Sequence, residues 1–160
     1  ASAAAGVLLR SWKLCNLTLP FAGGSFEPPC FFMEDGMLEI GLKNKRSCVV
    51  READTAQAHG SGTLPVFATP AMVALMERTA MESVQPYLAE GEGTVGTRIE
   101  VKHVAATAVG GEVTCESELS EIDRRRLVFA VHVYDARGTV GEGTHERFII
   151  NNEKFMAKLR

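Results

Sequence analysis

One helical segment sets the strongest limit on how this chain of 160 residues folds. Thr69-Pro70 predicts the start of a helix, because a threonine hydroxyl can cap free N–H groups and proline is tolerated in the first turn. The next six residues, Ala71 to Met76, are all apolar, and the helical pattern continues to about Gln85-Pro86. A helix that is apolar around its whole circumference has to be surrounded by other structure.

Segments that are predicted to be extended, and that can surround this helix, come both before and after it in the sequence. We expect a strand at Lys45 to Glu52 before the helix, and four strands after it at Thr94 to Ala105, Gly111 to Ile122, Leu127 to Tyr134 and Thr139 to Ile150. In the first of these four, alternation assigns one face to Val95, Thr97, Ile99, Val101 and His103. Leu127 to Tyr134 is apolar on both faces, which predicts a central strand. One long helix against an antiparallel sheet of about five strands is an α+β architecture.

The burial of this helix also predicts an oligomer. A single sheet cannot cover both sides of a helix that is apolar all round, and a second copy of the chain can complete the burial. We therefore expect a symmetric homodimer, with further assembly to a tetramer left open.

The first 36 residues differ in composition from the rest. The opening run is rich in alanine and serine and acid-poor, which is the composition of an organelle transit peptide or of a poorly ordered extension before Met33 or Met37. We expect the folded domain to span residues 37–160, with a short terminal helix within Asn151 to Arg160.

The overall composition excludes several classes of protein. A net charge of -3 and an isoelectric point near 5.8 give no electrostatic footprint for nucleic acid. No apolar run reaches the roughly 18 residues of a membrane span, so we expect a soluble protein. The four cysteines, Cys15, Cys30, Cys48 and Cys115, are too dispersed for a zinc site or a compact disulfide framework, so we expect no metal and a reducing, cytoplasmic location.

Two residues stand out as candidates for acid/base chemistry. Glu77 directly follows the apolar helical run, and His103 falls in phase with the inward face of its strand. A buried carboxylate is costly unless it is paired, and such groups cluster at functional sites. Packed together, the two side chains could activate water. The alternatives are that Glu77 pairs with a Lys or Arg at the edge of the helix and that His103 is an ordinary core residue.

Other motifs carry weaker signals. Gly91 to Gly96 spells GxGxxG, but it follows a helix and opens a strand, which is the reverse of a dinucleotide loop. Gly96 remains of interest because a glycine within a strand lets a ligand approach the backbone. Asp54 and His59 form a possible second acid/base pair in a loop that is more simply a solvated connection. Arg124 to Arg126 is expected in a hairpin turn, with attraction of cofactor phosphates as the alternative.

Several separated blocks resemble the fluoroacetyl-CoA thioesterase-like family. They are Pro65 to Glu77, Gly93 to Thr97, His103 to Thr107, Gly141 to Arg147 and Glu153 to Phe155, and the resemblance covers about Met37 to Arg160. The family resemblance implies the hot-dog fold, in which a long helix is wrapped by an antiparallel sheet, and a working homodimer.

The same resemblance implies a reaction and a set of residues. Thr69, Glu77 and His103 match the catalytic positions of the family, and Gly96 and Arg147 match positions that line the pocket for a small acyl group. The implied reaction is hydrolysis of an acyl-CoA thioester to a carboxylic acid and free coenzyme A, with no separate cofactor. By resemblance, Glu77 attacks the thioester or activates water, His103 moves protons and Thr69 positions the reacting groups.

One segment departs from the family pattern. In the fluoroacetyl-CoA enzymes the residues before the helix form a lid with phenylalanines, whereas Ala56 to Leu64 here are small and contain no Phe, Tyr or Trp. We therefore expect a broader acyl-CoA thioesterase. Two further hypotheses are a hot-dog enoyl-CoA hydratase or dehydratase that uses Asp54 and His59, and a non-catalytic acyl-CoA-binding module.

Overall fold

The computed structural model of the chain describes residues 37–160. The predictions for residues 1–36, including the targeting segment and the two cysteines Cys15 and Cys30, lie outside the described residues. In the described part no helix is long and apolar enough to cross a membrane.

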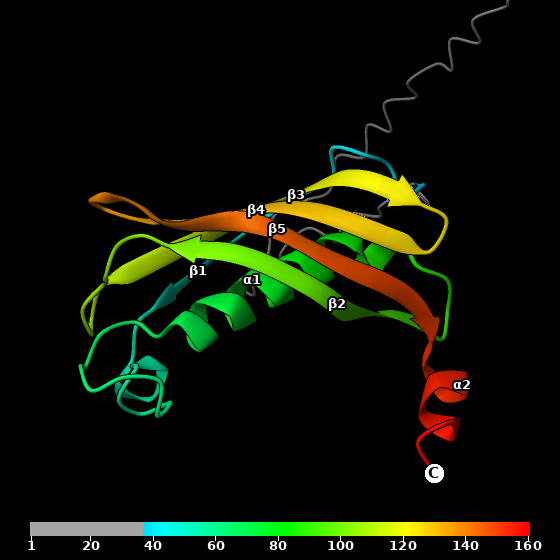
Figure 1. Cartoon of the computed structure of the whole chain (residues 1–160). Helices are drawn as coiled ribbons and strands as arrows, with labels where there is room; N and C mark the ends of the chain where they lie inside the picture. The colour runs from blue at the N-terminus through cyan, green and yellow to red at the C-terminus, as the bar shows by residue number, and fades with distance from the viewer. Residues whose placement is uncertain (1–36) are drawn as a thin grey trace, which may run out of the picture. The chain divides into compact units, whose positions relative to one another are not determined.

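Five antiparallel strands form one sheet with the order β1-β3-β4-β5-β2. The strands are β1 (Lys43–Val49), β2 (Glu92–His103), β3 (Glu112–Asp123), β4 (Arg126–Asp135) and β5 (Gly138–Asn151). The long helix α1 (Thr69–Val84) lies along one face of this sheet, as Figure 1 shows. Short 3₁₀ segments, η1 (Glu52–Asp54) and η2 (Gln85–Tyr87), precede and follow the helix, and α2 (Asn152–Ala157) extends beyond the end of β5.

This arrangement confirms the predicted α+β architecture and the central position of the strand that is apolar on both faces, β4. The first strand begins and ends earlier than predicted. After Val49 the chain leaves the sheet, because the backbone N–H of Arg51 donates to the Asp54 carboxylate and turns the chain into η1. The arginine hairpin is confirmed: Arg124, with φ of 55°, and Arg125 connect β3 to β4.

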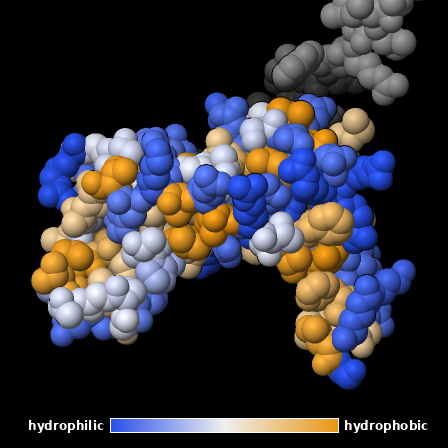
Figure 2. Space-filling view, viewed as in Figure 1, coloured by the Kyte–Doolittle hydropathy of each residue, from blue (hydrophilic) through white to orange (hydrophobic). Residues whose placement is uncertain are grey.

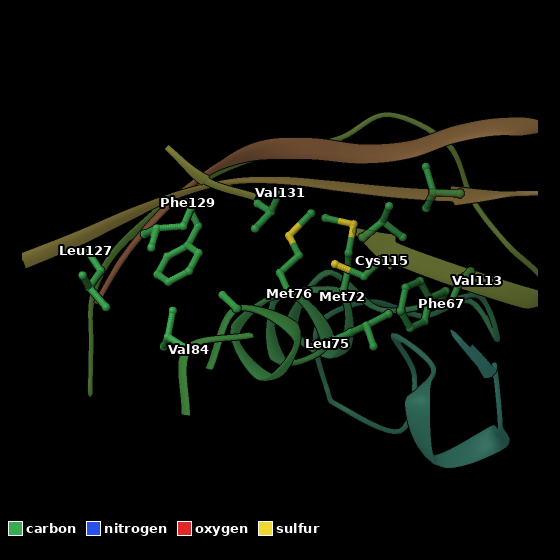
Figure 3. Close-up of a cluster of buried hydrophobic side chains, with 14 of the residues drawn as sticks. Phe67, Met72, Leu75, Met76, Val84, Val113, Cys115, Leu127, Phe129 and Val131 are labelled. Atoms are coloured by element: carbon green, nitrogen blue, oxygen red, sulfur yellow. The ribbon is translucent and has the colours of Figure 1, made fainter. Parts of the chain in front are cut away.

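The core lies between α1 and the inward face of the sheet. Figure 3 shows Met72 and Met76 extending from the helix toward the strands, where they meet side chains such as Val131. Each large apolar side chain that is fully buried contributes about 1.5–3 kcal/mol. The buried side chains of α1 are Met72, Leu75, Met76, Thr79, Ala80, Ser83 and Val84. They alternate with half-buried or exposed positions, so one sheet covers only one side of the helix.

The other side of α1 is not covered within the described chain. Ala74 and Arg78 are exposed, although the sequence places Ala74 in the middle of the apolar run. A second group of exposed apolar side chains lies near the C-terminus, where Figure 2 shows orange residues on the projecting end of the chain. These are Phe155, Met156 and Leu159. The sheet leaves this side of the helix uncovered, and its burial by a further copy of the chain stays a prediction.

A β-bulge at Thr97 changes the face assignment in β2. The register with β5 shifts between Gly96 and Arg98, so Thr97 is an extra residue and the alternation reverses at this point. Ile99, Val101 and His103 point inward as predicted, but in the first half of the strand Gly96 faces the helix rather than Val95. The prediction that Val95 and Thr97 share the inward face is therefore wrong, because strict alternation cannot anticipate a bulge.

Close pairing of β2 and β5 requires a glycine at position 143. A Cβ added to Gly143 would lie 2.7 Å from the Cα of Val101, which is backbone and cannot move aside cheaply. We expect Gly143→Ala to lower the free energy of unfolding by about 1–3 kcal/mol, the usual cost of overpacking. Chemical denaturation measures this change, with Thr144→Ala on the exposed face of the same strand as control. Equal stability of the two variants would contradict the close approach.

Candidate active site

Thr69 and His103 lie together at one end of the helix. The Thr69 hydroxyl is 2.9 Å from Nδ1 of His103, within hydrogen-bond distance. Thr69 is the first residue of α1 and is exposed, whereas His103 is the last residue of β2 and is half-buried. The two elements therefore bring together residues that are 34 positions apart in the sequence.

The structure corrects the predicted role of Thr69 as the helix cap. Ala68 is the N-cap residue, and no side chain caps this end of the helix. Thr69 is already helical, Pro70 follows it, and the threonine hydroxyl faces His103 instead of the helix backbone. The N–H groups of the first helical turn have no partner within the helix, so this end can stabilise a developing negative charge.

His103 borders an open cleft, which we name the Thr69–His103 cleft. The cleft has a volume of ≈ 350 Å³ and is lined by Ala56, Ser61, Val66, Phe67, Thr69, His103, Val104, Ala105 and Ala106. Burial lowers the pKa of His103 below its usual 6.5, and a backbone contact at Ala105 opposes this in part. Nε2 of His103 is buried and has no hydrogen-bond partner among the described residues. A neutral imidazole with an unused nitrogen is suited to proton transfer.

Glu77 lies in a different part of the molecule, the Glu77–Arg147 cleft. This space of ≈ 430 Å³ is lined by Ala74, Glu77, Arg78, Met81, Glu82 and Arg147. Glu77 is half-buried, and within residues 37–160 its carboxylate makes no ion pair or hydrogen bond. Arg147 donates instead to the backbone carbonyl of Glu77, at 3.4 Å. The carboxylate is thus held next to a guanidinium but remains available to a ligand.

Gly96 lies next to Glu77 and forms one group with Glu77 and Arg147. A Cβ at this position would lie 3.1 Å from Oε1 of Glu77 and 3.2 Å from Cε1 of His145. The strand can approach the carboxylate this closely because it carries no side chain here. The expected approach of a ligand to the backbone at Gly96 stays a prediction.

The five predicted site residues therefore form two groups in one copy of the chain. Thr69 and Glu77 are eight residues apart on α1, which corresponds to about 12 Å along the helix axis. The cleft that holds His103 does not include Glu77. The predicted contact between Glu77 and His103 does not occur within the described chain, although both face the same side of the sheet.

Asp54 and His59 do not form a hydrogen-bonded pair among the described residues, so the loop follows the simpler of the two expectations, a solvated connection. Both carboxylate oxygens of Asp54 accept hydrogen bonds from the Arg51 guanidinium, at 2.9 and 3.1 Å. The hydrogen bond from Arg51 also holds the pKa of Asp54 below its usual 3.8. A carboxylate held in this way is a poor base, so the geometry does not favour the hydratase hypothesis.

The sequence analysis missed His145 and Thr94, which both contact Arg147. Strand alternation contained the signal, since His145 and Arg147 are two residues apart in a strand and share a face. The described residues hold no group of three or more His, Cys, Asp or Glu side chains arranged for a metal ion.

Comparison with solved structures identifies the class of protein. A hypothetical protein from Thermus thermophilus, described as a thioesterase superfamily member, is 28% identical, with a TM-score of 0.71 over 76% of this chain and 90% of that one. The helix and the five-stranded sheet thus define a hot-dog thioesterase fold, as the sequence resemblance implied.

The family within this class follows from closer matches. A family model for fluoroacetyl-CoA-specific thioesterases matches residues 50–153. The fluoroacetyl-CoA thioesterase of Streptantibioticus cattleyicolor is 48% identical over 95 residues, which is 59% of this chain and 68% of that protein. A structure of the fluoroacetyl-CoA thioesterase FlK is 39% identical, with a TM-score of 0.74 over 78% of this chain and 97% of that one. The chain belongs to the fluoroacetyl-CoA-specific thioesterase family.

The close approach of Gly96 to Glu77 gives a direct test of the group formed by Glu77, Gly96 and Arg147. A methyl group at position 96 would push both the Glu77 carboxylate and the His145 ring by a few tenths of an ångström. Because small displacements of reacting groups reduce rates strongly, we expect Gly96→Ala to lower kcat/KM for a thioester substrate by about 10- to 100-fold. The measurement is steady-state hydrolysis together with an unfolding curve. An active variant with normal kinetics would show that Gly96 does not border the reacting atoms.

Proposed function

We propose that this protein hydrolyses acyl-CoA thioesters to a carboxylic acid and free coenzyme A, at a site built from Thr69, Glu77, His103, Gly96 and Arg147. The observation that carries the proposal is the hydrogen-bond distance between Thr69 and His103 at the border of an open cleft, together with the buried Nε2 of His103, which has no partner among the described residues. Membership of a thioesterase family supports the same reaction class.

The chemistry of the side chains suggests a role for each. The Thr69 hydroxyl and the first turn of α1 can hold the thioester carbonyl oxygen, where negative charge develops. The Glu77 carboxylate either attacks the carbonyl carbon directly or removes a proton from an attacking water. In the water route, the proton that water gives up passes through His103, which starts neutral, to the departing sulfur of coenzyme A. In the direct route, coenzyme A leaves as the thiolate, and the water that then hydrolyses the Glu77 anhydride supplies the proton. Over the full reaction, water supplies the oxygen of the acid and the proton of the thiol.

This mechanism needs a partner chain, because one copy keeps Glu77 apart from His103. Strand β2 is at the edge of the sheet, so one side of its 12 residues has no partner strand within the described chain. A long free edge favours strand pairing with another chain. Gly96 lies in the first half of β2 and His103 at its end. Antiparallel pairing of two β2 strands would bring Glu77 and Gly96 of one copy toward the partner's His103. We therefore propose a homodimer with two composite sites; tetramer formation stays open.

The segment before α1 bears on substrate choice. Ala56 and Ser61 from this segment line the Thr69–His103 cleft, which is the place where a lid would act. Their small side chains leave room for acyl groups of different size. We propose a substrate range broader than fluoroacetyl-CoA.

The proposed reaction requires no cofactor apart from the coenzyme A of the substrate. Within residues 37–160, Cys48 and Cys115 form no disulfide. We propose the cytoplasm as the location, because the dispersed cysteines give no compact disulfide framework.

A panel of thioesters tests the reaction and the substrate range together. The panel contains acetyl-, fluoroacetyl-, short branched, medium-chain and aryl-acyl-CoA, and mass spectrometry measures the release of free coenzyme A. This detection avoids thiol dyes, which would also react with the protein's cysteines. We expect turnover of several members with no strong preference for fluoroacetyl-CoA. A sharp fluoroacetyl preference would contradict the argument from Ala56 and Ser61, and binding without turnover would support a non-catalytic module.

Mixing two inactive variants tests the composite site. We expect Glu77→Gln and His103→Ala each to reduce kcat by about a hundredfold or more, since each removes a group that acts on the reacting atoms. In a mixed dimer, one site combines the intact Glu77 of one copy with the intact His103 of the other. After mixing and refolding, random assortment should restore about a quarter of the wild-type activity.

The activity after mixing distinguishes a composite site from a site contained in one chain. A site contained in one chain would give no recovery, because every copy carries one of the two changes. Glu118→Gln on the outer face of the sheet is the control for the glutamate change, and size-exclusion chromatography confirms that the variants remain dimers.

A further inference from the structure

His145 is almost completely buried, at 1% exposure, and the mechanism above gives it no task. It lies on β5 two residues before Arg147, which is 5% exposed, and both side chains point toward α1. Nε2 of His145 is 3.0 Å from Nη1 of Arg147. Two side chains that can both be cations are thus in contact in the interior, which is unfavourable unless one of them is neutral.

The hydrogen bonds of His145 fix its protonation state. Nδ1 is 2.9 Å from the backbone carbonyl oxygen of Arg98, which can only accept, so Nδ1 carries the hydrogen. Arg147 can only donate, so Nε2 must offer a lone pair. Only the neutral imidazole with its hydrogen on Nδ1 satisfies both contacts.

His145 is one of four acceptors that hold the Arg147 guanidinium. Nε and Nη2 of Arg147 donate to the side chain and the backbone carbonyl of Thr94, both at 2.8 Å. Nη1 donates to Nε2 of His145 and to the carbonyl oxygen of Glu77. These bonds use four of the five N–H groups of an arginine, which leaves one on Nη2 for a ligand. The acceptors come from α1, β2 and β5, so the guanidinium has little freedom to turn.

We propose that His145 is a positioning residue for the thioesterase site: as a neutral hydrogen-bond acceptor it holds Arg147 in the orientation that faces Glu77 and the acyl group. This inference rests on the proposed function, since it assigns the cluster around Arg147 to the acyl pocket. It also makes the site sensitive to acid. Protonation at Nε2 would remove the lone pair and turn an N–H group toward the N–H groups of Arg147.

The charged groups around His145 explain why it stays neutral. Burial is the largest effect and lowers its pKa below 6.5, and the positive charge of Arg147 acts in the same direction. The Arg98 carbonyl, Glu77 on α1 and Glu146 on β5 act in the opposite direction but do not reverse the shift. The unfolded chain therefore takes up a proton at this histidine at a higher pH than the folded protein does. Below about pH 6.5 this difference favours unfolding, by up to about tenfold in the unfolding constant per pH unit.

Two amide variants separate positioning of Arg147 from a purely structural role. In His145→Gln the side-chain oxygen can replace Nε2 and accept from Arg147. In His145→Asn the shorter amide can replace Nδ1 and keep the bond to the Arg98 carbonyl, but it leaves Arg147 without this acceptor. We expect the Asn variant to lose about 10- to 100-fold in kcat/KM at pH 8, as for a lost bond to a charged group, and the Gln variant to stay within about threefold of wild type.

The outcomes of this comparison are decisive. An active Asn variant with an impaired Gln variant would overturn the proposal, because only the bond to Arg98 would then matter. Wild-type activity in both would overturn it as well. His132→Gln, at a histidine on β4 that contacts Thr139, is the matched control and should leave activity unchanged.

Two measurements do not depend on activity and keep this inference separate from the proposed function. Long-range ¹H–¹⁵N NMR spectra should show His145 with its hydrogen on Nδ1 and mostly neutral at pH 6.5, where an ordinary histidine is half charged. On lowering the pH from 7.5 to 5, the unfolding constant should rise more for the wild type than for His145→Gln, and the His132→Gln control should follow the wild type. A His145 that is mostly charged at pH 6.5, or equal pH dependence in the wild type and the Gln variant, would refute the inference even if the enzyme is active. Failure of every thioester in the panel would refute the proposed function alone.

Discussion

The course of β2 alongside α1 is the constraint on which the rest of this structure depends. The helix buries one face against the sheet through Met72, Met76 and their neighbours, and this packing fixes its position over the strands. Because β2 runs in the opposite sense, its end lies beside the start of the helix and its first half lies beside the middle of the helix. Thr69 therefore meets His103, and Glu77 meets Gly96. The Thr69–His103 pair and the Glu77–Gly96 pair therefore lie at separate points along the apolar layer between the helix and the sheet.

The group around Glu77 combines a close backbone approach with a fixed cation. Gly96 lets the strand come within contact distance of the carboxylate. Arg147 is buried, which lowers its pKa through desolvation, while the charge of Glu77 opposes that change. Hydrogen bonds that the guanidinium donates to Thr94 and His145 replace part of the water that it loses on burial. The position of Arg147 thus depends on residues that do not themselves face the open cleft.

The surface of a single copy has two features that the proposed homodimer would cover. The outward side of α1 includes Ala74, an apolar residue that is exposed here, and β2 has a free edge of 12 residues. A helix with apolar residues on its outer side and an unpaired strand are both unfavourable in isolation. A two-fold partner would satisfy both and would bring the two halves of the proposed site together. Stability and catalysis would then depend on the same contact.

Much of this organisation is encoded in local sequence. The run Ala71 to Met76 predicts a helix packed against other structure, and alternation in the strands predicts a sheet with one buried face. The structure has the sheet, and this sheet covers one side of the helix. Pattern and family resemblance also proposed Thr69, Glu77, His103, Gly96 and Arg147 as site residues. The tertiary structure alone decided which of them touch. It moved Thr69 from capping the helix to facing His103, shifted the inward face of β2 at the Thr97 bulge, and placed His145 next to Arg147. These outcomes depend on strand register and on the packing of distant segments, which residue spacing along a chain does not specify.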